Sequence, residues 1–128
     1  MMPTDVDRVI KAVARVAQSL ARFGERFAKR ILCDEELEQF RAHKQPSHFL
    51  AKRFAAKEAF SKALGSGIRA PATWHAIRVE KQPSGRPVLG FSDALSAHLR
   101  AQGVVGSHVS LTDERDLAMA TVILECAT

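Results

Sequence analysis

The segment from Phe49 to Gly67, FLAKRFAAKEAFSKALGSG, constrains the fold most, because it predicts one long helix with two covered faces. At roughly 100° per residue, Phe60 falls on the same stripe as Phe49, and this stripe faces a core. The opposite face carries small and apolar residues around Glu58 and Lys62. A helix that is apolar on two sides is covered on two sides, so the fold must place structure on both faces.

Glu58 is the residue of chemical interest on this helix. A carboxylate on a covered face needs a partner, and a metal ion or a phosphate-bearing ligand is a natural one. The alternative is a surface ion pair, since Glu58 precedes Lys62 by four residues, the favourable order on a helix. Such a pair contributes only about a few tenths of a kcal/mol.

Proline and glycine mark the ends of the long helix. Pro46 suits its first turn, and the glycines at 65 and 67 predict its end. Asp34 is a suitable N-cap for a preceding helix from Glu35 to His43. Further helices are expected before it, broken at Gly24, because apolar residues recur at helical spacing near the N-terminus, at Val9, Val13, Val16 and Leu20.

The second half changes to a two-residue period. Ile77 and Val79 alternate within 74–81, a turn follows at 83–85, and 87–91 is expected to return as a strand. Ser92 can cap a helix that runs to about Gln102. Two more strands are expected over 108–111 and 117–124. These elements predict an α+β fold in a single domain over 1–128, with N-terminal helices packed on an antiparallel sheet.

The bulk composition is that of an ordinary globular domain with a positive charge. Nineteen Lys and Arg residues against fourteen Asp and Glu residues give a net charge of +5, which predicts an acidic partner. Cys33 and Cys126 lack metal-ligand spacing, and no apolar run is long enough for a membrane span, so we expect free thiols in the cytoplasm and no membrane contact. Eight aromatic residues and no basic helix argue against a nucleic-acid-binding module.

Three segments resemble holo-[acyl-carrier-protein] synthases, the small bacterial 4'-phosphopantetheinyl transferases. The segment RFAAKEAFSKALGSGI at 53–68 is similar to the signature helix and turn of the family. The segment FGERFAKRIL at 23–32 looks like the part that precedes the short acidic helix of the family. The segment HVSLTDERDLAMATVILE at 108–125 resembles its C-terminal hairpin. The combination is specific, although each piece alone is weak.

The resemblance implies an enzyme that moves the phosphopantetheine arm of coenzyme A onto a serine of acyl carrier protein, for fatty acid biosynthesis, and releases 3',5'-ADP. It implies that magnesium is bound by Glu58 and that Lys62 faces the diphosphate. It matches His108 to a histidine near the coenzyme. The expected coenzyme contacts also include the other lysine and the glycine turn: Lys57, Gly65, Ser66 and Gly67. The backbone N–H groups of that turn would approach phosphate.

The resemblance also implies partners. Arg15 and Arg26 match arginines that meet acyl carrier protein, and Arg22 lies between them in the sequence. An acidic carrier would explain both these arginines and the positive net charge. The resemblance further implies a homotrimer with three active sites in the clefts between subunits.

The N-terminus departs from the family pattern. The family opens with an apolar strand whose aspartate is the second metal ligand, but the family spacing counted back from Arg15 lands on Val9. Asp5 could serve if the chain loops, and Asp7 is the fallback. A start residue that differs from the native one is another explanation. If the second ligand is absent, the alternative function is a catalytically weakened homologue that binds coenzyme A or a carrier without transfer.

Overall fold

We describe residues 4–127 of a computed structural model. These described residues form ten helices and strands. They are β1 (Thr4–Ala12), α1 (Val13–Phe23), α2 (Glu25–Ile31), α3 (Asp34–Ala42), α4 (Pro46–Leu64), β2 (Ile77–Lys81), β3 (Pro87–Phe91), α5 (Asp93–Ala101), β4 (Val104–Asp113) and β5 (Leu117–Cys126). None of the helices in the described part of the chain combines the length and the apolar character that a membrane span requires.

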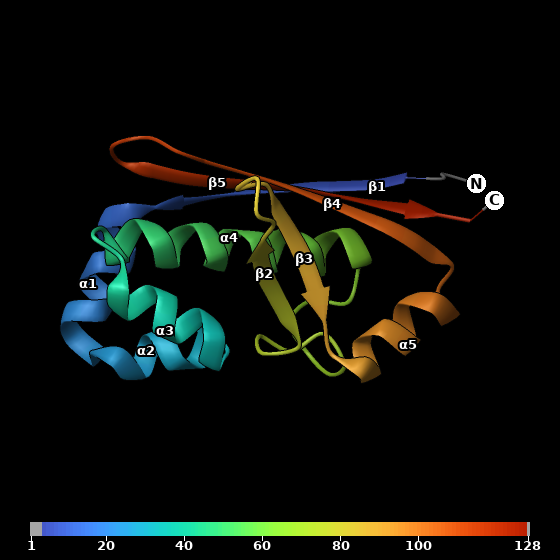
Figure 1. Cartoon of the computed structure of the whole chain (residues 1–128), viewed down its shortest axis with the longest axis horizontal. Coiled ribbons are helices and arrows are strands. Elements are labelled where there is room, and N and C mark those ends of the chain that lie inside the picture. The colour runs from blue at the N-terminus through green and yellow to red at the C-terminus, as the bar shows by residue number, and fades with distance from the viewer. Residues whose placement is uncertain (1–3, 128) are drawn as a thin grey trace.

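The strands of residues 4–127 form two antiparallel sheets. The larger has the order β1-β5-β4, and the smaller is the β2–β3 hairpin. Figure 1 shows the larger sheet lying along α4, with α1, α2 and α3 gathered at one end and α5 at the other. The chain is therefore α+β with helices packed on an antiparallel sheet, as predicted.

Helix α4 is the centre of the molecule. Pro46 lies in its first turn, and Gly65 closes it in the left-handed conformation with φ 85°. Both predicted faces are covered, because Phe49 and Phe60 are buried on one side and Ala51 on the other. The helix contributes to both hydrophobic clusters found in the described part of the chain, so it joins the sheet to the α1–α3 end.

The first residues correct one prediction. Residues 4–12 form a strand rather than the start of a helix, and α1 begins only at Val13. The strand pairs with β5 along its whole length, for example Val9 with Ala120. This pairing joins residues that are more than a hundred positions apart, so local spacing could not reveal it. Val9 belongs to the strand, whereas Val13 and Val16 are the buried positions of the helix.

The other helices and strands begin or end within a few residues of their predicted positions. The capping residue of α3 is Cys33, not Asp34, because the Glu36 carboxylate accepts a hydrogen bond from the Cys33 backbone N–H at 3.1 Å. Ser92 caps α5 as predicted, and its hydroxyl accepts from the Leu95 N–H. Strands β4 and β5 are longer than predicted, at ten residues each.

Candidate functional site

Glu58 forms an ion pair with Lys11. The Lys11 ammonium contacts Glu58 Oε1, and both side chains are 26% exposed. The contact lacks hydrogen-bond geometry, and the buried Oε1 atom makes no hydrogen bond to any residue in 4–127. The predicted surface pair with Lys62 is not found in this described range, where the partner of Glu58 is Lys11. Glu58 is therefore a shielded carboxylate held by one cation from β1.

The alternation of β1 explains why Lys11 reaches Glu58. Residues two apart on a strand point to the same side, so Lys11 shares a face with Val9. Val9 is only 7% exposed and lies in the core cluster with Ala55 and Ala59 of α4. The position that the family spacing assigned to a second metal ligand is thus a buried apolar side chain.

The two aspartates of β1 do not reach Glu58. Asp5 lies six residues from Lys11, which is about 20 Å along an extended strand. Its carboxylate is exposed and lies 3.9 Å from Cys126 Sγ. Asp7 Oδ1 accepts a hydrogen bond from the adjacent Arg8 N–H at 2.7 Å. The described residues contain no group of three His, Cys, Asp or Glu side chains that could hold a metal ion.

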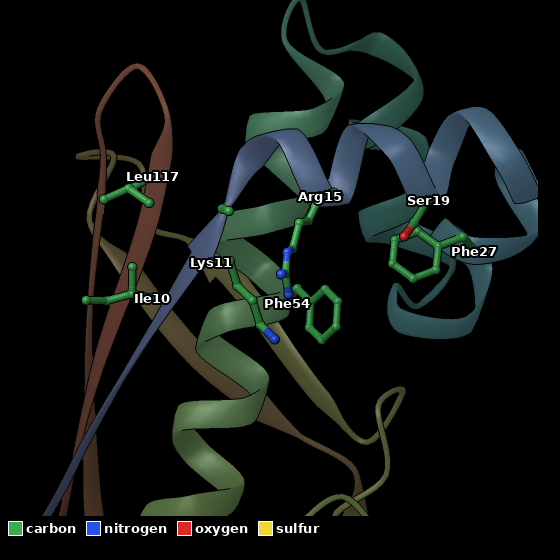
Figure 2. A pocket seen from close by; sticks show the side chains of 9 residues that line it. Ile10, Lys11, Arg15, Ser19, Phe27, Phe54 and Leu117 are labelled. Carbon is green, nitrogen blue, oxygen red and sulfur yellow. The ribbon is translucent and has the colours of Figure 1, made fainter.

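A cavity of about 520 Å³ lies beside this ion pair, between β1, α1, α2 and α4. Figure 2 shows the side chains of Lys11 and Arg15 extending from β1 and α1 toward Phe54. The Lys11 ammonium lies 4.1 Å from the centroid of the Phe54 ring. Phe27 and Ser19 line the other side of the cavity. The cavity offers two cations and two aromatic rings to a ligand, a combination that suits an anion attached to an organic group.

The predicted arginines form a continuous surface with this cavity. Arg15 and Arg22 line a second hollow with Phe23, and Arg26 and Arg30 line a third with the same Phe23. Phe23 is 52% exposed, which is unusual for so large an apolar side chain. The sequence reasoning missed Phe23 and Arg30, although their place beside Arg22 and Arg26 was a signal. We call these residues, Arg15, Arg22, Phe23, Arg26 and Arg30, the arginine surface.

Lys62 and His108 have different relations to Glu58. Lys62 is exposed and lies one helical turn beyond Glu58, on the same side of α4. His108 lies on the outer face of the sheet, where its Nε2 contacts Glu125 Oε1 at 2.5 Å. The alternation of β4 sets this orientation, because the neighbouring Val109 packs into the core that α4 shares. Within one chain, Glu58 and His108 lie on opposite sides of the sheet.

The prediction that Lys57 faces a ligand is wrong. Its side chain is fully buried, and its ammonium donates to three oxygens, the Ile31 carbonyl, the Trp74 carbonyl and Glu36 Oε1, at 2.7, 2.9 and 2.6 Å. Burial lowers the pKa of Lys57, and the Glu36 carboxylate opposes that shift. Lys57 therefore joins α4 to the α2–α3 segment and the loop before β2, and it has no free hydrogen for a coenzyme.

Glu36 is the centre of a buried polar cluster that the sequence reasoning missed. Its Oε2 accepts from the Val79 N–H at 2.9 Å and lies 3.5 Å from Arg53 Nε. Arg53 donates to the Val79 carbonyl and to Gln39, and burial lowers its pKa. No local sequence pattern predicts this cluster, since Glu36 and Lys57 are 21 residues apart in the chain. It fixes α3 and β2 on the side of α4 away from Glu58.

The glycine turn after α4 also differs from its prediction. The backbone N–H groups of Gly65, Ser66 and Gly67 all donate to the Ser61 carbonyl, at 3.0, 3.2 and 3.3 Å. They satisfy the C-terminal end of the helix and are not free to approach a phosphate. In the structure this turn is a simple C-cap of α4.

Comparisons with known proteins give matches over most of the chain. The sequence model described as 4'-phosphopantetheinyl transferase superfamily matches residues 10–122. A holo-[acyl-carrier-protein] synthase from Azoarcus sp. is 49% identical over 113 residues, which cover 88% of this chain and 90% of the relative.

Two solved structures have the same fold. The crystal structure of holo-[acyl-carrier-protein] synthase from Neisseria meningitidis matches with a TM-score of 0.91 and 39% identity, over 94% of this chain and 97% of that one. The Bacillus anthracis enzyme, solved in complex with CoA (3',5'-ADP), matches with a TM-score of 0.80 and 30% identity, over 96% of each chain.

Proposed function

Since the chain belongs to the holo-[acyl-carrier-protein] synthases of the 4'-phosphopantetheinyl transferase superfamily, we propose that its reaction takes place at Glu58 and the adjoining cavity. The chain is an enzyme that transfers 4'-phosphopantetheine from coenzyme A to acyl carrier protein. The observation that supports the proposed location is the shielded Glu58 carboxylate beside a cavity that carries Lys11 and Arg15.

The transfer is a phosphoryl-group substitution. The serine oxygen of the carrier attacks the phosphorus that bears the pantetheine arm, and the bond from that phosphorus to the 3',5'-ADP oxygen breaks. The serine proton passes to solvent water, and 3',5'-ADP leaves with the bonding electron pair. Such reactions depend mainly on positioning and on neutralising charge. The protein therefore needs cations beside the diphosphate and a group that orients the serine hydroxyl.

The residues of the chain can supply these functions. Glu58 orients the serine hydroxyl through the accessible part of its carboxylate, since the side chain is 26% exposed while Oε1 is buried against Lys11. Lys62, exposed one turn further along α4, stabilises the departing 3',5'-ADP. Lys11 and Arg15 bind phosphate from the cavity side. Lys57 is excluded from the site, since its three hydrogen bonds stay inside the core.

The magnesium ion that the resemblance implies does not fit the described residues. Magnesium in such sites is bound by one or two carboxylates together with phosphate oxygens and water. Glu58 already contacts the Lys11 ammonium, Val9 has no ligand atom, and Asp5 lies far along the strand. The pair of Glu58 and Asp5 does not form a metal site in this conformation, so we assign no step of the transfer to a metal.

A trimer would complete the site. His108 lies on the outer face of the sheet, and that face also exposes Val6 and Ile10, at 59% and 56%. An apolar sheet face of this kind suits contact with another copy of the chain. We propose that the copies assemble through this face and that His108 of one copy completes the site around Glu58 of its neighbour.

The arginine surface is the proposed docking site for acyl carrier protein. It combines four guanidinium groups with the exposed Phe23 ring, which suits an acidic partner that also offers an apolar side chain. It is continuous with the cavity through Arg15, so a docked carrier would present its serine near Glu58. We place the enzyme in the cytoplasm, where Cys33 and Cys126 stay reduced.

The test of the site is transfer to a carrier. Apo-carrier and coenzyme A are mixed with the protein, and the carrier is weighed by mass spectrometry. We expect the carrier to gain the phosphopantetheine mass with the native protein and to gain none with Glu58→Ala. Glu80→Ala is the matched control, because Glu80 pairs with Arg78 on the surface of the hairpin. Equal transfer by Glu58→Ala and Glu80→Ala would overturn the proposed site.

Mixed oligomers test the completion of the site by a neighbouring copy. Glu58→Ala and His108→Ala proteins are each expected to be inactive alone. Denatured together and refolded as a mixture, they should regain part of the activity, because some clefts then pair an intact Glu58 with an intact His108. A mixture as inactive as its two parents would contradict a site shared between copies.

The buried Val9 favours a second candidate, which is coenzyme binding without transfer. This second candidate predicts that calorimetry detects binding of coenzyme A while the carrier gains no mass. The mass measurement above distinguishes the two candidates, since only the first predicts a modified carrier.

A further inference from the structure

We propose that the Lys11 ammonium occupies the place beside Glu58 that a divalent cation would need, and that the chain binds the diphosphate of coenzyme A through this ammonium without a metal ion. The inference rests on the proposed function and goes beyond it, because it concerns the cation that the site uses. The observation behind it is the Lys11–Glu58 ion pair at the wall of the cavity.

The ammonium and a metal ion exclude one another at this position. Among the described residues, Glu58 Oε1 is a buried carboxylate oxygen at this place, and Lys11 Nζ is in contact with it. Two cations on one carboxylate oxygen would repel each other strongly in a region of low dielectric. Val9 supplies no oxygen that could compensate by holding the metal from the other side. The site therefore has room for one cation, and the chain supplies it.

Lys11 is also placed to meet a ligand. Its side chain is 26% exposed, so the ammonium is reachable although its stem is covered. It lies over the Phe54 ring, 4.1 Å from the centroid, which restricts its movement. Figure 2 shows Lys11 and Arg15 approaching the same ring from two different elements. Together they present two positive charges at one wall of the cavity, enough to neutralise a diphosphate.

The ammonium can bridge the carboxylate and the phosphate. A lysine ammonium carries three hydrogens and no acceptor, so one hydrogen can face Glu58 while the others face phosphate oxygens. Charge-assisted hydrogen bonds of this kind are about twice as strong as neutral ones. The Lys11 side chain would then do what a bridging metal does, hold an anionic ligand against an anionic side chain.

Calorimetry of coenzyme A binding tests the proposal directly. Affinity is measured at constant ionic strength with excess magnesium and with excess chelator. We expect the native protein to bind equally well in both. We expect Lys11→Met to bind at least about tenfold more weakly in chelator, because a charge-assisted contact is lost. Lys52→Met is the matched control, since Lys52 is 23% exposed and pairs with Asp113; it should bind like the native protein.

Three results of these binding measurements would overturn the proposal. Native binding that tightens about tenfold or more with magnesium would show that a metal takes part. Lys11→Met binding equal to that of Lys52→Met would show that the ammonium does not contact the ligand. Absence of coenzyme binding under both conditions would instead overturn the proposed function itself, and this inference with it.

Manganese binding provides a readout that needs no ligand or activity. The paramagnetic resonance signal of free Mn²⁺ is followed as protein is added. We expect the native protein to leave the signal unchanged, and the double variant Val9→Asp/Lys11→Ala to reduce it, because that change supplies a second carboxylate and removes the ammonium. Stoichiometric uptake of Mn²⁺ by the native protein, lost in Glu58→Gln, would overturn the proposal.

Discussion

The Lys57 ammonium donates to Glu36 Oε1 at 2.6 Å in a part of the core that excludes solvent, where the Arg53 guanidinium lies on the other oxygen of the same carboxylate at 3.5 Å. One buried carboxylate is thus the counter-charge of two buried cations. Val79 and Cys33 donate their backbone N–H groups to it as well. This cluster, and not the Glu58 region, fixes α3, α4 and β2 to one another.

The first prediction concerns Glu36. We expect Glu36→Gln to lower the free energy of unfolding by about 3–5 kcal/mol, because it leaves two buried cations without a counter-charge. The measurement is urea unfolding near neutral pH. Glu25→Gln is the control, since Glu25 pairs with Arg41 on the exposed surface; its unfolding midpoint should not move. Equal midpoints for the two variants would contradict the prediction.

The second prediction concerns pH and Lys57. Burial lowers the pKa of Lys57 in the folded state below its unfolded value of about 10.4. Between the folded and the unfolded pKa, the unfolded chain binds more protons, so the free energy of unfolding rises with pH in that window. The contribution of Lys57 to the free energy of unfolding is complete above its pKa in the unfolded chain. It is lost as the pH falls through its pKa in the folded protein.

Lys57→Met isolates this effect. Both proteins also carry Cys33→Ser, because burial raises the pKa of the Cys33 thiol, Lys57 lowers it, and the titration of that thiol would otherwise differ between them. The difference between their unfolding free energies, the protein with Lys57 minus the one with Lys57→Met, should increase as pH is raised toward about 10. A difference that stays constant over that range would show that Lys57 titrates alike in the folded and unfolded chain.

The third prediction concerns the Cys33 thiol. Burial raises its pKa, so less of the reactive thiolate is present near neutral pH. We expect iodoacetamide to modify Cys33 more slowly in the folded protein than in the same protein unfolded by urea, with the difference narrowing as pH rises. Cys126→Ser leaves Cys33 as the sole thiol, and mass spectrometry follows the reaction. Equal rates at neutral pH would refute the prediction.

The fourth prediction concerns the end of α4. Gly65 has φ 85°, and a Cβ there would meet no atom within 4 Å, so the strain of Gly65→Ala comes from the backbone alone. We expect a loss of about 1–2 kcal/mol in the free energy of unfolding. Gly106→Ala is the control, because that glycine has no positive φ and its Cβ would meet Glu125 only at ordinary contact distance, 3.7 Å. Similar losses in both variants would contradict the argument.

The sequence predicted the parts of the fold that local signals determine. The Pro46 and Gly65 ends of α4, the capping by Ser92 and the strand at 87–91 all depend on neighbours in the chain, and the structure has each of them. Strand β1 was missed because Val9, Val13 and Val16 recur at helical spacing across the junction between a strand and a helix. Only pairing with the distant β5 makes the first residues extended.

The site residues, like the strands, could be predicted only where local sequence patterns determine them. Glu58 was found because its helix carries a specific local pattern, but its partner Lys11 was not, since their contact depends on how β1 crosses α4. Both lysines around Glu58 were expected to contact the coenzyme, although only Lys62 was placed on the same helix face as Glu58. A helix turns by about 100° per residue, so Lys57 points into the core and Lys62 into solvent. Which neighbour is buried depends on what covers each face, and the sequence does not state that.

The last prediction concerns assembly through the outer face of the sheet. Val6 is 59% exposed and stands opposite Ile123 of β5, on the face that carries His108. We expect Val6→Glu to reduce the mass in solution from that of the proposed trimer to that of one chain, because a carboxylate would be desolvated at the contact. Light scattering measures the mass, and circular dichroism should show unchanged secondary structure. Gln82→Glu adds the same charge to the exposed β2–β3 turn and should leave the mass unaltered. If Val6→Glu keeps the native mass, the copies do not meet through this face, and His108 cannot reach a neighbouring Glu58 by the route proposed.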